Sequence, residues 1–184
     1  ISGPAVISGE KVDFKNDNLQ ANTWLDTSVK DIAFQGTDAK NVYVRSDKGN
    51  PGAIYNSIEL NPRAHVIRVG ADDVTIDNLC IKYTGAHGVS SGGVKNLVVT
   101  NCEFGFIGGS WFRTDTLSRY GNAVEIYGAV DGYVVDNCYI YHCYDAGVTH
   151  QLTQSPDQEC IMADIHYTNN VITYTSYPVE YFIN

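Results

Sequence analysis

The chain has 184 residues, of which 43% are hydrophobic and 18% charged, and its formal net charge is −9. This length fits one domain with a sizeable core. The acidic balance, without a cluster of Lys and Arg, argues against partners such as nucleic acids or anionic membranes. No apolar run reaches the roughly 18 residues of a membrane span. The high content of Tyr and Gly, 13 and 17 residues, favours strands and tight turns over helices.

The first part of the chain, residues 1–56, contains short mixed strand patterns at positions 6–9, 29–34 and 42–44 that fit no repeat. Because the ends of repeat proteins need atypical units, we predict that residues 1–56 cap the first repeat. Residues 57–184 are then predicted to form the repeat domain.

Four segments of this domain align, each an alternating strand followed by an Asn and a second short strand. The aligned residues are Asn78, Asn101, Asn137 and Asn169. Their spacings are 23, 36 and 32 positions, so we take 23 as the bare repeat and the excess as loop insertions near residues 108–121 and 152–163. Equivalent side chains of stacked parallel strands form columns, and we expect this Asn column to point inward at a bend, bonded to neighbouring backbone groups.

Two further columns follow the Asn column. One is apolar and is expected to fill the interior, with Ile81, Phe104, Ile140 and Ile172. The other contains Leu79, Cys102, Cys138 and Asn170. We expect Cys102 and Cys138 to be stacked, reduced and packed as small hydrophobic residues, because side chains in parallel register rarely reach the torsion that a disulfide needs.

A third strand precedes each aligned segment, at residues 67–70, 89–92, 124–128, 148–151 and 179–182. With the Val and Ile positions inward, the alternate residues form an outward row. This row contains Arg68, Ser90, Glu125, Thr149 and Glu180. The pattern predicts an all-β fold, a single-stranded right-handed parallel β-helix; a β-sandwich is the rival fold but would not explain the Asn column. The last strand leaves an open edge, so we expect further coils or another chain to cover it.

The chain also carries the motifs PAVISG (4–9), GNP (49–51), SIE (57–59) and YGNAVE (120–125). Together with the Asn and Cys columns, these motifs resemble right-handed parallel β-helix proteins of the pectate-lyase-like superfamily. Within it, the chain is similar to uncharacterised polysaccharide-active relatives from plant-fibre-degrading bacteria. The resemblance implies a secreted or cell-surface protein whose partner is a polysaccharide or oligosaccharide. It does not fix the chemistry, because the superfamily includes lyases, hydrolases, esterases, epimerases and phage tailspikes.

The outward row also holds two carboxylates. Glu125 and Glu180 should lie two strand spacings apart, about 9.5 Å, close to the roughly 6.5–9.5 Å of the carboxyl pair in an inverting glycosidase. The insertions on both sides of the row would make a groove for an extended polymer. We therefore predict a glycoside hydrolase in which Glu125 protonates the leaving oxygen and Glu180 activates water. The alternative is that Glu125 and Glu180 are ordinary solvated glutamates without a catalytic role.

Side chains around this pair are expected to bind the substrate. They are Arg68, Thr149, Tyr127, Gln151, Trp111 and Arg119. Arg68 suits the carboxylate of an acidic sugar, and Trp111 would either stack on sugar rings or pin its insertion. His150, which points inward by alternation and is expected to be a core histidine, is a secondary catalytic candidate together with Asp145 at the turn before it.

Two other functions stay open. A polysaccharide lyase acting on uronate-containing polymers would need a basic residue, such as Arg68, Arg113 or Arg119, and charge neutralisation by Arg or Ca²⁺. The acidic residues do not cluster for calcium, and the hydrolase needs no metal or cofactor. A non-catalytic carbohydrate-binding or adhesin β-helix would have a bland outer face without flanking loops.

Overall fold

The computed structural model describes residues 24–26, 42–44, 50–57, 63–113, 118–152 and 161–183. The chain divides into two compact units, residues 1–60 with 111–118, and residues 61–110 with 119–184. Among the described residues, no helix has the length and apolarity needed to cross a membrane. Most of the predicted cap at 1–56 lies outside the described residues, so the capping role stays a prediction.

The first unit contains little regular structure within the described ranges. Strand β1 (Trp24–Asp26) pairs antiparallel with β2 (Val42–Val44), and α1 (Pro51–Ile54) is a single helical turn. Strands β9 (Trp111–Arg113) and β10 (Ser118–Arg119) form a two-stranded sheet within the first long insertion.

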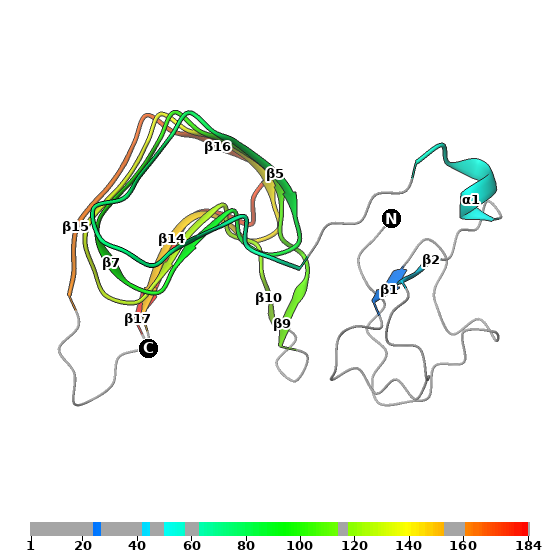
Figure 1. Cartoon of the computed structure of the whole chain (residues 1–184), viewed down its shortest axis with the longest axis horizontal. Coiled ribbons are helices and arrows are strands. Elements are labelled where there is room, and N and C mark those ends of the chain that lie inside the picture. Colours follow the sequence, from blue (N-terminus) through cyan, green and yellow to red (C-terminus); the bar gives the residue numbers. More distant parts are fainter. Residues whose placement is uncertain are drawn as a thin grey trace. The chain divides into compact units, whose positions relative to one another are not determined.

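The second unit is built from three parallel sheets, which we call sheets I, II and III (Figure 1). Sheet I contains β3 (Ile67–Val69), β6 (Val89–Ser91), β11 (Val124–Tyr127), β14 (Ala146–Leu152) and β17 (Tyr177–Ile183). Sheet II contains β4 (Thr75–Asp77), β7 (Val94–Thr100), β12 (Val130–Asp136) and β15 (Met162–Thr168). Sheet III contains β5 (Cys80–Thr84), β8 (Glu103–Ile107), β13 (Tyr139–Cys143) and β16 (Val171–Thr173).

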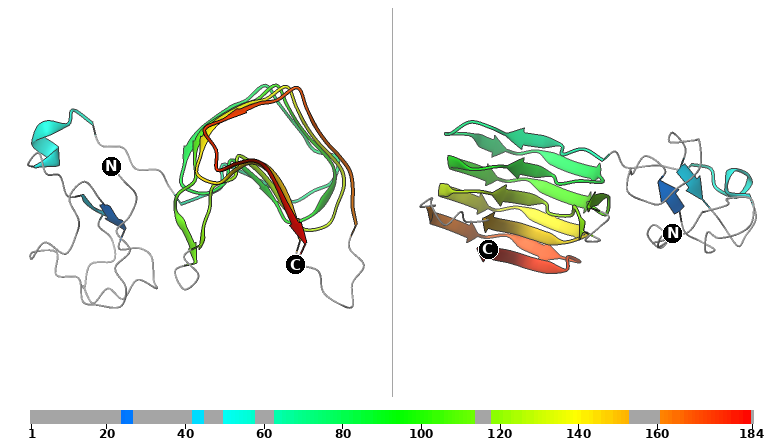
Figure 2. Two further views of the ribbon diagram at one scale, coloured as in Figure 1. Left: turned by 180° about the vertical axis from the view of Figure 1, so that it is seen from behind. Right: turned by 90° about the horizontal axis from the view of Figure 1, so that it is seen from below.

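The chain visits the three sheets in a fixed order, and each visit adds one strand beside the previous one. One passage through sheets I, II and III is a repeat, and β17 follows the fourth repeat. Viewed from the side, the repeats form successive layers (Figure 2). The all-β class and the parallel pairing predicted from the sequence are therefore confirmed.

The interior of this unit is filled by the inward residues of all three sheets. Leu97, Val99 and Tyr133 are fully buried in sheet II. In sheet III, the predicted apolar column is confirmed: Phe104 pairs with Ile81 and Ile140, and all three are buried. Ile172 continues the column and packs, partly buried, against the same core.

The Asn column exists, but its predicted direction is wrong. Asn78, Asn101, Asn137 and Asn169 are exposed, and all have positive φ, between 50° and 57°. Asn tolerates this left-handed conformation, which turns the chain between sheets II and III and directs its own side chain outward. The Asn side chains form hydrogen bonds along the surface. Asn137 Nδ2 donates to Asn101 Oδ1 at 2.8 Å, and Asn101 Nδ2 donates to Asp77 Oδ1 at 2.7 Å.

At the second and third bends, the residue after the Asn takes a buried, inward position. Cys102 and Cys138 are buried and free, as predicted, whereas Leu79 is exposed. In the fourth repeat, Asn170 makes the hydrogen bonds to the backbone that we expected of Asn169 and the rest of the Asn column. Its Oδ1 accepts the Cys138 N–H at 2.8 Å, and its Nδ2 donates to the Val135 carbonyl at 2.7 Å.

Candidate functional site

The outward row of sheet I has the predicted register. Glu125 pairs with Ser90 on one side and with Thr149 on the other. Arg68 pairs with Ser90, and Thr149 pairs with Glu180. The two glutamates therefore lie two strands apart with Thr149 between them, as the alternation of side chains requires.

The Glu125 carboxylate is held through one oxygen. Asn122 Nδ2 donates to Glu125 Oε2 at 2.6 Å, and His87 Nε2 lies 3.0 Å from the same oxygen. Only 12% of the Glu125 side chain is exposed. Both partners belong to the bends that precede strands of sheet I, His87 before β6 and Asn122 before β11. One oxygen of the carboxylate is thus occupied by two N–H groups.

Sequence reasoning missed both of these partners. His87 was not among the candidate residues, and Asn122 entered only as part of the YGNAVE motif. One signal was available: Val89 pairs with Val124, so His87 and Asn122, each two residues earlier, occupy equivalent positions in successive repeats. A column of polar side chains at a buried bend is a place where hydrogen-bond partners must be supplied.

Glu180 lies in a different environment. Burial raises its pKa, and the nearby carboxylates of Asp145 and Glu125 raise it further. A hydrogen bond of 2.6 Å from Gln151 Nε2 to Glu180 Oε2 opposes this shift. Glu180 therefore retains a proton to a higher pH than an isolated glutamate does.

Asp145 is the third carboxyl group of this neighbourhood. Burial raises its pKa and the Glu125 carboxylate raises it too, whereas His87 lowers it only when its ring is positively charged. Its bend packs tightly on the previous one: a Cβ on Gly121 would lie 2.6 Å from the Asp145 nitrogen, so the contact requires glycine there. The structure thus brings together Glu125, Asp145 and Glu180, which the sequence separates by up to 55 positions.

Thr149, between the two glutamates, is completely buried although it belongs to the outward row. Its Oγ1 has no hydrogen-bond partner among the described residues. Leaving a buried hydroxyl unpaired costs about 1–3 kcal/mol.

The remaining predicted binding residues do not all join this cluster. Tyr127, exposed on the outward face, pairs in register with the buried Gln151. Arg119 donates from Nη1 to the Gly109 carbonyl at 3.0 Å and lies over the Tyr144 ring, so its guanidinium is engaged within the protein.

The structure gives less information on two other predicted binding residues, Arg68 and Trp111. The pKa of the His65 imidazole is lowered by burial first, then by His87, and then by the charge of Arg68. The Trp111 side chain lies outside the described residues. The groove predicted between the two insertions also remains a prediction, since residues 114–117 and 153–160 are not described.

His150 lies on the inward face, opposite to the face of Glu125. It pairs in register with Ile126, which is fully buried in the core. Its Nδ1 lies 2.8 Å from the Tyr167 hydroxyl, and its ring stacks on Tyr181. Burial lowers the pKa of His150. These contacts agree with the prediction of a hydrogen-bonded core histidine.

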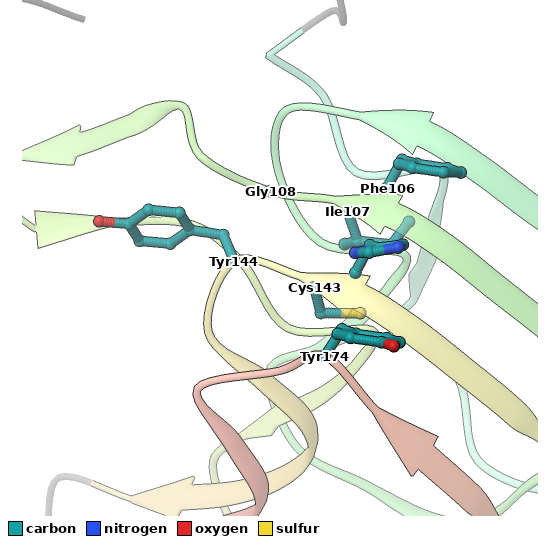
Figure 3. Close-up of a pocket in the computed structure, with 7 residues that line it drawn as sticks. Phe106, Ile107, Gly108, Cys143, Tyr144 and Tyr174 are labelled. Carbon is teal, nitrogen blue, oxygen red and sulfur yellow. The ribbon is translucent and has the colours of Figure 1, made fainter. Parts of the chain in front are cut away.

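A separate surface cavity of about 340 Å³ lies at the ends of strands β8 and β13 of sheet III (Figure 3). Its lining residues are Phe106, Ile107, Gly108, His142, Cys143, Tyr144 and Tyr174. Three of the rings form a stack: His142 lies 5.2 Å from Phe106 and 4.8 Å from Tyr174 between ring centroids. None of the residues predicted to act on a substrate lines this cavity.

Within the ranges that the structure describes, no group of three or more His, Cys, Asp or Glu side chains is arranged to hold a metal ion. No protein-family model, curated protein sequence or solved structure matches the chain.

Proposed function

We propose that the second unit is a right-handed parallel β-helix and that the outward row of its sheet I hydrolyses glycosidic bonds in a plant or microbial polysaccharide. The fixed order in which the chain visits three parallel sheets supports this fold. Parallel strands joined by crossovers are right-handed in nearly all proteins, which supports the handedness. The motifs that resemble the pectate-lyase-like superfamily agree with both. A secreted or cell-surface location follows from such a substrate.

The proposed activity rests on one observation: Glu125 and Glu180 share one outward row, two strands apart, in different environments. Two strand spacings are about 9.5 Å, which is near the separation of the carboxyl pair of an inverting glycosidase. Carboxyl groups whose environments differ in this way can divide the roles of acid and base.

The environments support a division of roles opposite to the one expected from the sequence. Glu180, whose pKa is raised, is the general acid and donates its proton to the glycosidic oxygen as the carbon–oxygen bond breaks. Glu125, whose Oε2 accepts two N–H groups, is the base, and its Oε1 takes a proton from the attacking water. Attack on the face opposite to the leaving group inverts the anomeric configuration.

Asp145 supports the same chemistry. Its carboxyl group raises the pKa of Glu180 and so helps to keep the acid protonated. When ionised, it adds negative charge close to the oxocarbenium-like transition state, which carries positive charge on the sugar ring.

The charges around the pair favour hydrolysis over the lyase reaction. Among the described residues, no Lys or Arg contributes to the pKa shifts of Asp145 and Glu180. A lyase needs a cation beside the uronate carboxylate. The row offers Arg68, two strands from Glu125 on the side away from Glu180, whereas Asp145 and Glu180 lie beside other carboxyl groups. A passive carbohydrate-binding surface would not need a pair of carboxyl groups with unlike environments.

A screen against plant and microbial polysaccharides tests the proposal. We expect new reducing ends without absorbance from unsaturated uronates, and a product of inverted anomeric configuration by NMR. On a cleaved polysaccharide, Glu125→Gln and Glu180→Gln should each lower turnover by about 10²–10⁴-fold. The matched control is Glu103→Gln, because Glu103 lies on sheet III, paired with Lys82. Full activity in both site variants would reject the pair, and unsaturated products would favour the lyase.

A further inference from the structure

We propose that a column of side chains at the bends before sheet I positions the Glu125 carboxylate, with His87 acting as the Nε2–H tautomer and Asn122 as the second donor. The effect on turnover rests on the proposed function, whereas the tautomer and the hydrogen bonds do not. His87 and Asn122 are positioning residues, since they act through Glu125.

The column links successive repeats through their backbone. The Nδ1 of His65 accepts the N–H of His87 at 3.3 Å, and the Nδ1 of His87 accepts the N–H of Asn122 at 3.0 Å. In the next repeat, the Oδ1 of Asn122 accepts the N–H of Ala146 at 2.9 Å. Each side chain therefore satisfies a buried backbone donor of the repeat that follows.

These backbone bonds decide which atoms face Glu125. A nitrogen that accepts a hydrogen bond carries no proton, so the neutral ring of His87 is protonated on Nε2. That atom lies 3.0 Å from Glu125 Oε2 and donates to it. The same reasoning fixes the Asn122 amide: its oxygen accepts the Ala146 N–H, so its nitrogen faces Glu125 and donates at 2.6 Å.

Packing holds the His87 ring in this orientation. The ring is 4% exposed, stacks on His65 at 5.1 Å with planes 10° apart, and meets the edge of Tyr120 at 5.0 Å. The following residue must be Gly88, because a Cβ there would lie 2.5 Å from the Ala123 carbonyl oxygen. A flipped ring would face Glu125 with a different atom and leave the Asn122 N–H without its acceptor.

The result is a carboxylate with two distinct oxygens. Oε2 of Glu125 is occupied by His87 and Asn122, whereas Oε1 has no hydrogen bond to any of the residues that the structure describes and is available to accept a proton from water. Holding a catalytic group in one geometry is a major source of rate enhancement. Residues that orient another functional side chain in this way are typically important for activity.

The first experiment measures the tautomer without a substrate. The chain, labelled with ¹⁵N-histidine, is examined by long-range ¹H–¹⁵N NMR at neutral pH, and the His87 signals are assigned by their loss in His87→Asn. We expect a protonated Nε2 and an unprotonated Nδ1. His166, an exposed residue 2.8 Å from Asp164, is the matched control, and His166→Gln should leave the His87 signals unchanged. A His87 ring protonated on Nδ1 would overturn the inference.

The second experiment separates positioning from folding. Asn122→Asp keeps the oxygen that accepts the Ala146 N–H but replaces the donor to Glu125 by a carboxylate oxygen. His87→Asn keeps an acceptor for the backbone, as Asn122 itself does, and His87→Leu removes it. On a polysaccharide that the chain cleaves, Asn122→Asp and His87→Leu should lower kcat by about 10- to 100-fold with little change in KM. His87→Asn should retain more activity than His87→Leu.

Thermal melts identify any variant that has lost its fold. An Asn122→Asp variant that folds and keeps the parental kcat would overturn the positioning role. If the chain cleaves no polysaccharide of the panel, the proposed function fails, and the NMR experiment alone decides the inference about His87.

Discussion

Gln151 donates a hydrogen bond of 2.6 Å from its Nε2 to Oε2 of Glu180 on the neighbouring strand of sheet I. The sequence predicted Gln151 as a substrate-binding residue, and the structure gives its amide a partner within the protein. The bond favours the ionised form of Glu180 and works against the burial that raises the pKa of this group. Gln151 therefore limits how far the pKa of the proposed acid rises.

Replacing this amide should move the pH dependence of catalysis. Gln151→Met removes the donor while keeping a similar length, so the pKa of Glu180 should rise further. Because the acid must be protonated to act, activity is lost as the pH rises through this pKa, and the alkaline limb should move to higher pH. The measurement is kcat against pH on a cleaved polysaccharide. If the alkaline limb stays in place or moves to lower pH, the ionisation of Glu180 does not set that limb.

The stability of the fold should also depend on Glu180, with a defined sign. Its pKa is raised by burial, so between the unfolded value of about 4.3 and the folded value the native state binds more protons than the unfolded state. The free energy of unfolding then falls as the pH rises through this window. Glu180→Gln should therefore be more stable than the parent at neutral pH, with the difference vanishing in acid. Urea unfolding at both pH values measures this.

Glu103 provides a control of opposite sign. Lys82 and the Tyr141 hydroxyl lower the pKa of this exposed carboxyl. Its contribution to stability is therefore present above the unfolded pKa and is lost as the pH falls through the folded pKa. Glu103→Gln should be no more stable than the parent at neutral pH. Equal pH dependence in the Glu103 and Glu180 variants would contradict the assigned environments.

The two kinds of bend asparagine should respond differently to substitution. Asn137 is exposed with φ of 50°, so Asn137→Gly should be nearly neutral and Asn137→Val should cost about 1–2 kcal/mol. Asn170→Ala leaves the Cys138 N–H and the Val135 carbonyl unpaired and should cost about 1–3 kcal/mol. Chemical denaturation measures all three, and Asn137→Val as stable as Asn137→Gly would refute the bend geometry.

The described cysteines should differ in reactivity. Burial raises the pKa of Cys138 to about 11 and that of Cys143 to about 12, whereas Cys80 is exposed. Since the thiolate is the nucleophile, iodoacetamide should alkylate Cys80 long before the other two in the native protein. Peptide mapping by mass spectrometry follows the order. A mass deficit of about 2 Da on a peptide pair from Cys102 and Cys138 would instead indicate a disulfide.

The register of the outward row could be predicted from the sequence because side chains alternate strictly along a strand. With Val124 and Ile126 inward, Glu125 must face outward, and the aligned repeats put Thr149 on the next strand and Glu180 on the strand after that. The direction of the Asn column could not be predicted in this way. A positive φ at the bend changes which residue points inward, and alternation carries no information about it.

The partners of Glu125 were missed for a different reason. His87 and Asn122 are 35 positions apart, with an insertion between them, and they meet only because their two bends stack. Their roles follow from hydrogen bonds to the backbone of the next repeat, which depend on how closely the bends approach. The column of His65, His87 and Asn122 also mixes two residue types, so it does not stand out as a repeated letter.

The stacked rings of Phe106, His142 and Tyr174 continue to Tyr83, whose ring lies 5.2 Å from that of Phe106. Each ring comes from a different repeat, so the stack persists only while all four repeats keep their spacing. The two tyrosines at the ends of the stack, Tyr83 and Tyr174, absorb in the near ultraviolet, and the circular dichroism of each depends on the ring packed beside it. Their near-ultraviolet signals should therefore disappear together if the four layers separate in one step, and at different denaturant concentrations if the layers separate one by one.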